Sequence, residues 1–228
     1  MSCKRSKPYD VQQVRIIQCS GRRRVYFSIT TSVRVTRMAL PHSIFTTPEE
    51  YLQMDRHSPV RHEYIDGLAY ALAGGSLNHS AACMNLGSYL HRLLRGSSCR
   101  VYNSDARVHL SPTRYVYPDL SISCDPQDPG ETDLLRSPRV TIEALSPGTE
   151  AYDRGDKFAY YRECPTVQEY VLVASEHRAV EVFRRPQTQE NISSWGGQTY
   201  TSGGLIVLTS VNVQIPFDEV YAETTVPT

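Results

Sequence analysis

The chain of 228 residues has an ordinary globular composition, with 40% hydrophobic and 21% charged residues. Its 24 Lys and Arg residues balance 24 Asp and Glu residues, so the formal net charge is zero. No apolar run approaches the roughly 20 residues of a membrane-spanning helix, which excludes a membrane-spanning protein. The six cysteines include no Cys-x-x-Cys pair. This pattern predicts free thiols in a reducing, cytoplasmic compartment rather than a disulfide framework or a zinc site.

The charge is unevenly distributed along the chain. Residues 1–37 hold nine Lys and Arg residues and one acid, whereas residues 38–228 hold 15 basic and 23 acidic side chains, a net charge of −8. The basic segment is typical of a nucleic-acid-binding arm, of a targeting peptide, or of sequence upstream of the native start. The start-like sequence Met38-Ala39-Leu40-Pro41 favours the third interpretation. We therefore expect a disordered or poorly packed extension over 1–37 and one domain over 38–228.

Lysine is rare in this domain. The whole chain has 21 arginines and three lysines, and after residue 37 Lys157 stands alone among 14 arginines. Most exposed cationic positions accept either residue, so a lysine that persists among arginines can mark a need for a compact, rotatable charge.

The first predicted elements are a short helix, a hairpin and a long helix. Thr47-Pro48-Glu49-Glu50 supplies an N-cap, a first-turn proline and a capping-box acid, which predicts a helix over 47–55. Residues 62–72 alternate as two strands around the turn Asp66-Gly67. A long helix is predicted from Asn78 to Gly96, and its apolar stripe consists of Ala82, Leu86, Leu90, Leu93 and Leu94.

The remainder of the chain is mostly β in pattern. One further helix is predicted over 152–163, where Cys164-Pro165 ends it. The predicted strands cover residues 99–103, 106–110, 115–124, 139–145, 168–174, 179–185, 198–201, 205–209 and 212–215. This order predicts an α+β domain with a mixed central sheet flanked by helices.

Two acids stand at the ends of apolar strands. Asp119 follows Pro118, and Glu143 directly precedes Ala144-Leu145 and a Pro-Gly loop. Burial of a carboxylate costs several kcal/mol unless it is paired or bound to metal. Either acid alone is explained by a backbone donor or an arginine. Adjacent strands could bring both carboxylates to one edge of the sheet, where a divalent cation would remove their mutual repulsion.

A set of ordered motifs accompanies these acids. Pro-Asp at 118–119, Glu143-Ala-Leu-Ser-Pro-Gly-Thr, Asp153-Arg-Gly-Asp-Lys157 and Gln168-Glu-Tyr follow one another in the chain. Together with Glu63 before Ile-Asp-Gly, they resemble the Uma-type restriction endonuclease family of the PD-(D/E)xK nuclease superfamily. The resemblance covers roughly residues 40–222.

The resemblance implies a restriction-endonuclease-like core and a metal-dependent phosphodiesterase site. Carried onto this chain, Asp119 and Glu143 would bind the metal, Lys157 would be the catalytic lysine, and Glu63 would be a further acidic member. The general superfamily motif Glu-x-Lys is absent because residue 145 is leucine. The Uma-type family resembles this chain in taking its lysine from the next helix.

Other residues near these motifs receive more ordinary interpretations. His79 and Asp153 are secondary site candidates; His79 is also suited to a helix cap, and Asp153 to complementing the N-terminal end of the Lys157 helix. We expect Tyr160 and Tyr161 to pack behind Lys157. Asp105 and Arg107 are expected to be solvated residues of a strand.

The leading hypothesis is an endonuclease that uses Mg²⁺ or Mn²⁺ to hydrolyse nucleic acid. DNA is the favoured substrate, although the sequence does not distinguish it from RNA, and a homodimer is one assembly left open. The alternatives are a non-catalytic regulatory protein with the same fold, whose acids would be engaged by arginines, and a hydrolase of small phosphoesters. The net charge of −8 argues against tight duplex binding unless a local basic patch exists. The candidates for such a patch are Arg92, Arg95, Arg100, Arg136 and Arg139.

Overall fold

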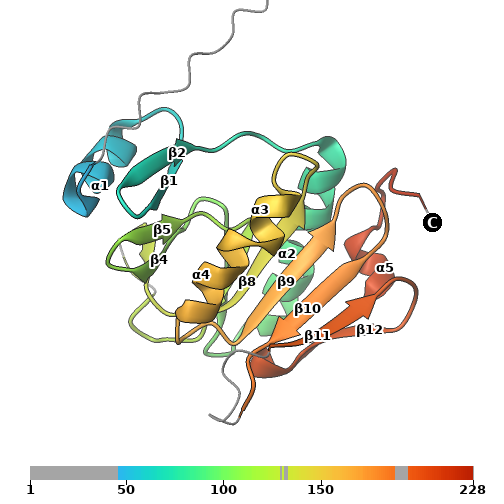
Figure 1. The fold of residues 1–228 in the computed structure, drawn as a ribbon. Helices are drawn as coiled ribbons and strands as arrows, with labels where there is room; N and C mark the ends of the chain where they lie inside the picture. Colours follow the sequence, from blue (N-terminus) through green and yellow to red (C-terminus); the bar gives the residue numbers. More distant parts are fainter. Residues whose placement is uncertain (1–45, 129, 131–132, 188–194, 228) are drawn as a thin grey trace, which may run out of the picture. The chain divides into compact units, whose positions relative to one another are not determined.

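The computed structural model describes residues 46–128, 130, 133–187 and 195–227. The extension expected over 1–37 and the domain boundary expected at Met38 lie outside these residues. The described elements are runs of consecutive strands separated by a few helices, and the strands form three sheets with helices packed against them (Figure 1). This arrangement confirms the α+β class predicted from the sequence. No helix in the described part of the chain has the length and apolarity needed to cross a membrane.

The largest sheet has six strands in the order β11-β10-β9-β8-β6-β3. Its bounds are Arg100–Asn103 for β3, Leu120–Ser123 for β6, Pro138–Leu145 for β8, Glu169–Ala174 for β9, Val180–Arg184 for β10 and Gly196–Tyr200 for β11. The strands β8 and β9 are parallel, whereas the other pairs in this sheet are antiparallel. The parallel pair is buried along almost its whole length, as expected for strands covered on both faces.

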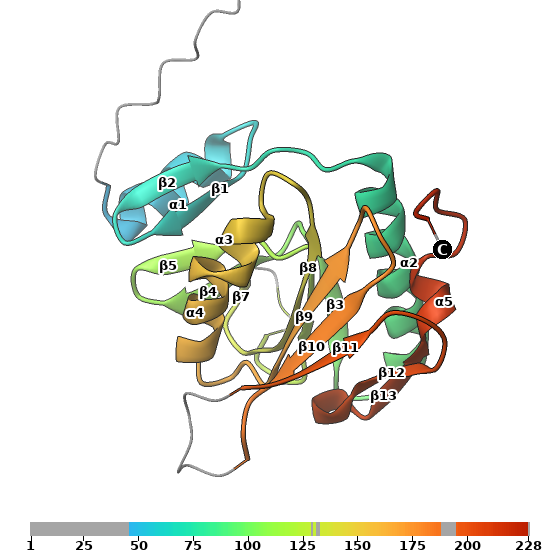
Figure 2. The same cartoon turned by 45° about the vertical axis from the view of Figure 1, so that its right-hand side comes forward.

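Helices and a second sheet cover the two faces of the six-stranded sheet. Helix α2 (Leu77–Leu94) packs Ala82, Leu86, Leu90 and Leu94 against one face, where α5 (Phe217–Val220) also lies. On the other face, α3 (Glu150–Arg154) and α4 (Asp156–Glu163) form the crossover between β8 and β9 (Figure 2). The predicted apolar stripe of α2 is thus confirmed except at Leu93, which is exposed.

The second sheet has five short strands in the order β2-β1-β5-β4-β7. Their bounds are His62–Ile65 for β1, Leu68–Ala71 for β2, Arg107–Ser111 for β4, Arg114–Val116 for β5 and Leu134–Leu135 for β7. Helix α1 (Pro48–His57) packs Tyr51 against Tyr64 of β1. The predicted capping box is present: the Glu50 backbone N–H donates to Thr47 Oγ1, and the Thr47 backbone N–H donates to Glu50 Oε2. The remaining strands, β12 (Leu205–Leu208) and β13 (Val213–Pro216), pair with each other around a short 3-10 turn, η2 (Thr209–Val211).

Two predicted elements are interrupted in the structure. The strand expected over 115–124 is divided between β5 and β6, which belong to different sheets. Pro118 lies at this division and has no N–H to continue a ladder. The helix expected over 152–163 is divided at Gly155, whose φ of −103° and ψ of −102° are not helical. A Cβ at this position would lie 2.9 Å from the Ala151 carbonyl oxygen. Both interruptions place residues of the candidate site.

The structure corrects the expectation of free thiols at one pair of cysteines. Cys99 precedes β3 and Cys124 follows β6, and the two form a disulfide. The ladder explains this, since Arg100 pairs with Ser123 and the next residues outward face each other. Among the other described cysteines, Cys83 and Cys164 are not disulfide-bonded. The cytoplasmic location that the free thiols suggested stays a prediction.

Candidate active site

The predicted site residues meet at one end of the six-stranded sheet. Glu143 belongs to β8, and Asp119 immediately precedes β6. Glu63 comes from β1 of the second sheet, and Lys157 stands in the first turn of α4. The division of the chain at Pro118 turns Asp119 toward β8, where its Oδ2 accepts a hydrogen bond of 2.8 Å from the Ala144 backbone N–H.

Lys157 lies at the centre of the acidic cluster. Its Nζ is 2.9 Å from Glu63 Oε1 and 2.9 Å from Glu143 Oε1, and its side chain is only 6% exposed. Burial by itself would lower the pKa of Lys157, but the neighbouring Glu143 and Glu63 carboxylates outweigh burial and hold this pKa well above its ordinary value. The lysine therefore carries a positive charge, which makes it an electrostatic group rather than a proton acceptor.

Glu143 is as buried as the lysine. Tyr161 donates a hydrogen bond of 2.6 Å to Glu143 Oε1, the same oxygen that faces Lys157, so Oε2 takes neither contact. Burial raises the pKa of Glu143 to about 8, and the charges of Asp119, Asp153 and Glu63 act in the same direction against the opposing lysine. A single ammonium group does not compensate several carboxylates in a buried volume, so Glu143 binds a proton more readily than an exposed glutamate does.

Glu63 is held from two sides. Its Oε2 accepts a hydrogen bond of 3.2 Å from the Tyr152 hydroxyl, and its Oε1 accepts one of 3.3 Å from the Tyr117 backbone N–H. Tyr117 is in turn fixed by Arg107, whose Nε donates to the Tyr117 hydroxyl over 2.9 Å. Arg107 is 1% exposed and also pairs with Asp55 at 2.8 Å. The expectation of a solvated Arg107 is therefore wrong: this arginine supports the segment that carries Glu63's partner.

Asp119 and His79 form the more open side of the site. His79 Nε2 is 3.2 Å from Asp119 Oδ2, and the Asp119 side chain is 22% exposed. The hydrogen bond that His79 donates to Asp119 raises the pKa of His79 against the effect of burial. His79 stands in the first turn of α2 after the N-cap Ser76. Its ring packs so closely on Gly75 that a Cβ there would lie 2.6 Å from Nδ1.

The remaining secondary candidate, Asp153, also faces the lysine. It precedes Lys157 by four residues across the break at Gly155, its Oδ1 is 3.9 Å from Lys157 Nζ, and the residue is 3% exposed. Burial raises the pKa of Asp153, with the Lys157 charge opposing. All six predicted residues are thus brought together, in a cluster around Lys157 and a pair formed by Asp119 and His79.

Two tyrosines belong to the site although the sequence interpretation gave them no part in it. Tyr161 was expected only to pack, yet it binds Glu143, and Tyr152 binds Glu63. Tyr161 follows Lys157 by four residues, so the helical spacing could have placed both side chains on one face. Tyr152 lies on α3, and the sequence carries no comparable signal for it because α3 is separated from α4 at Gly155.

The donor set fits a hard divalent cation. Mg²⁺ prefers oxygen ligands and commonly takes one or two carboxylates while keeping several waters. Both contacts of Asp119 fall on Oδ2 and both contacts of Glu143 fall on Oε1. One oxygen on each acid is therefore not committed to these partners.

The chain is similar to known proteins in sequence and in fold. Residues 48–208 match the model of the Uma2 family, described as "Putative restriction endonuclease". The uncharacterized proteins slr1290 and sll1609 of Synechocystis sp. are 36% and 29% identical to the chain, over 77% and 61% of it and 90% and 80% of their own lengths. A crystal structure of a putative nuclease belonging to DUF820 from Anabaena variabilis superposes with a TM-score of 0.64 at 19% identity, covering 78% of this chain and 98% of that one. The restriction-endonuclease-like fold expected from the sequence is confirmed.

Proposed function

This chain belongs to the Uma2 family of putative restriction endonucleases, and we propose that it is an endonuclease that uses Mg²⁺ or Mn²⁺ to hydrolyse phosphodiester bonds of DNA. Family membership supports a nuclease in general terms, and we propose the metal and the substrate in addition. The observation that carries it is the buried Lys157, which lies 2.9 Å from both Glu63 and Glu143 beside the partly exposed Asp119.

Each residue has a role that its surroundings support. Asp119 and Glu143 would hold the cation through the oxygens that their protein partners leave free. When bound, the cation would act as a Lewis acid and lower the pKa of a coordinated water. Lys157 keeps its proton and supplies positive charge toward the phosphoryl oxygens, where charge accumulates during cleavage. Glu63 and Tyr161 fix the position of the lysine and of Glu143, respectively.

The ion pairs favour a catalytic protein over a regulatory one with the same fold. A non-catalytic protein would be expected to neutralise its acids with arginines. Among the ion pairs between described residues, the partners of Glu63, Asp119, Glu143 and Asp153 are Lys157 and His79, and none is an arginine.

A segment without acids offers a path for the nucleic acid. Residues 67–104 contain no Asp or Glu, although the domain as a whole is acidic. This segment contains α2, which begins at the candidate site and whose 18 residues span about 27 Å. That length corresponds to roughly eight base pairs of duplex at 3.4 Å per step.

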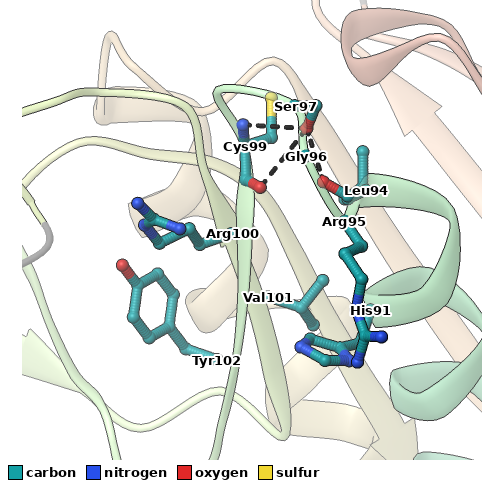
Figure 3. A pocket seen from close by; sticks show the side chains of 9 residues that line it. All are labelled: His91, Leu94, Arg95, Gly96, Ser97, Cys99, Arg100, Val101 and Tyr102. Atoms are coloured by element: carbon teal, nitrogen blue, oxygen red, sulfur yellow. Dashed lines mark hydrogen bonds between the residues drawn. The ribbon is translucent and has the colours of Figure 1, made fainter.

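A pocket lies at the far end of α2, beside the edge strand β3. In Figure 3, His91 and Arg95 lie on the α2 side of this strand and Arg100 lies on its other side. Cations on both sides of an edge strand are suited to contacting backbone phosphates. We therefore place part of the duplex along α2, between the acids of the site and this pocket.

The double substitution R95A R100A is expected to weaken duplex binding and to reduce the salt dependence of binding. Removal of two phosphate contacts lowers the slope of log K against log salt by about 2. Fluorescence anisotropy with a labelled duplex of about 30 base pairs, between 50 and 200 mM salt in chelator, measures this slope. The control R56A R162A removes the same charge from α1 and α4. Equal slopes for the two double variants would contradict the proposed path.

The proposed function is tested by metal-dependent cleavage of supercoiled plasmid and single-stranded DNA. We expect cleavage with Mn²⁺ or Mg²⁺, none with chelator, and a loss of at least 100-fold in D119N, because the amide is a poor ligand and carries no charge. The control D105N makes the same change at an exposed acid whose side chain is 63% exposed. Absence of metal-dependent cleavage on DNA, RNA and chromogenic phosphoesters would refute the proposal, and cleavage of the esters alone would favour a hydrolase of small phosphoesters.

A further inference from the structure

Beside the carboxylate cluster lies a group with different donor chemistry. His79, Cys83 and Asp119 each offer one ligand atom, and these atoms all lie within 4.8 Å of one another. His79 and Cys83 are four residues apart on α2, so they share one face of the helix. The proposed Mg²⁺ site uses the carboxylate of Asp119, but it gives no role to the Cys83 thiol.

The three side chains are held in place by their surroundings. His79 Nε2 is 3.2 Å from Asp119 Oδ2, and His79 Nδ1 is 3.9 Å from Cys83 Sγ. Asp119 is fixed by the Ala144 backbone N–H, and the His79 ring fills the space that a side chain at Gly75 would occupy. All three residues are partly buried rather than exposed. The ligand atoms are therefore constrained from both the helix and the sheet.

A sulfur, a ring nitrogen and a carboxylate oxygen form a ligand set for a borderline-soft cation. Zinc binds all three types at 2.0–2.3 Å, commonly with three protein ligands and one open position. Mg²⁺ takes oxygen ligands and is not suited to a thiol. We propose that His79, Cys83 and Asp119 form a transition-metal site, with zinc as its natural occupant, next to the proposed Mg²⁺ site.

The two sites share Asp119, and this sharing couples them. Zinc binding displaces the thiol proton of Cys83 to solvent, leaves the imidazole neutral and draws Asp119 toward the new cation. The Mg²⁺ site thereby loses part of one ligand and faces a second positive charge. Zinc must lower the affinity for Mg²⁺ and, by reciprocity, Mg²⁺ must lower the affinity for zinc by the same factor. This coupling, and only this part, rests on the proposed function. The cysteine pattern of the sequence gave no sign of the site because a single cysteine takes part.

The test uses Co²⁺ as a spectroscopic substitute for zinc on the full-length chain. We expect one equivalent of Co²⁺ to give a sulfur-to-cobalt charge-transfer band that zinc abolishes by displacement. The band should be lost in C83S, and H79A should bind Co²⁺ at least tenfold more weakly. It should persist in C164S, which removes the other described free thiol, and in C3S C19S. A band that survives in C83S, or its absence from the wild type, would overturn the site.

The shared ligand is tested by Mg²⁺ titration calorimetry with and without one equivalent of zinc. A fall of at least tenfold in Mg²⁺ affinity is expected in the wild type, with no change in C83S. Unaltered Mg²⁺ affinity in zinc-loaded wild type would show that Asp119 is not shared. Because neither readout requires cleavage, a chain that binds zinc as expected but cuts no substrate would refute the nuclease proposal and leave the zinc site standing.

Discussion

The substitution K157A is expected to reduce metal-dependent cleavage by 100-fold or more while Mg²⁺ binding is retained. Lys157 Nζ is 2.9 Å from Glu63 and Glu143, so its charge is fixed at the cluster and adjacent to the proposed metal ligands. A preorganised charge of this kind contributes about 10²- to 10³-fold to the rate of a reaction that develops negative charge. Single-turnover cleavage at saturating enzyme measures the loss, and calorimetry in the same buffer measures Mg²⁺ binding.

The same substitution also leaves two buried carboxylates without their cation. Breaking a buried ion pair on one side costs about 3–5 kcal/mol, so K157A alone could lose activity by unfolding. The double variant K157M E63Q removes the lysine together with one acid and is expected to restore the thermal stability without restoring cleavage. R154A, at an exposed position on α3 with its side chain 35% exposed, is the control and should cleave normally. Cleavage near the wild-type rate in a folded Lys157 variant would exclude the proposed role.

Features set by neighbouring residues were predicted well from the sequence. The start of α1 follows from Thr47 and Glu50, whose capping bonds form within four residues. The stripe of α2 follows from the helical period, and the positions of Asp119 and Glu143 follow from the apolar strands beside them. Such signals depend on a single turn or strand, where local geometry and burial agree.

Features set by residues far apart in the chain were not predictable in detail. Glu63 and Lys157 are separated by 94 positions, and only the packing of the second sheet against α4 brings them together. The resemblance to a family suggested that Glu63 belonged to the site, but it did not indicate an ion pair. Arg107 was wrongly expected to be solvated, because its place in the alternation of the strand is typical of a surface residue. It instead pairs with Asp55 of the first helix and is fully buried.

Two breaks in regular structure position residues of the candidate site. Pro118 ends one strand and directs the next residue, Asp119, to the backbone of Ala144. Gly155 separates α3 from α4, so that Asp153 and Lys157 face each other across the break rather than along one straight helix. The apolar periodicity of the sequence continues across both positions. Periodicity alone does not reveal the missing N–H of a proline or the non-helical conformation of a glycine.

The folded protein is expected to lose stability as the pH rises, because of Glu143. Burial raises the pKa of this acid from 4.5 to about 8. Between these values the folded state holds a proton on Glu143 that the unfolded state releases, so the contribution of Glu143 to the free energy of unfolding falls with pH by up to about 1.4 kcal/mol per unit. Below about pH 4.5 both states are protonated, and above about pH 8 neither is, so the contribution becomes constant.

The substitution E143Q should remove this slope, since glutamine keeps the shape of the acid and cannot ionise. We expect urea unfolding in chelator to show that, between pH 5.5 and 7.5, the free energy of unfolding of the wild type falls by about 2 kcal/mol relative to that of E143Q. E163Q changes an exposed acid of α4, with its side chain 67% exposed, and should follow the wild-type profile. Mg²⁺ should stabilise the wild type more at pH 8 than at pH 6 and E143Q at neither, because the cation competes with the proton for this carboxylate. Parallel profiles for wild type and E143Q would mean that Glu143 is already ionised beside Lys157. Both proposed metal ligands would then be ionised before the cation binds, and no proton would have to leave Glu143.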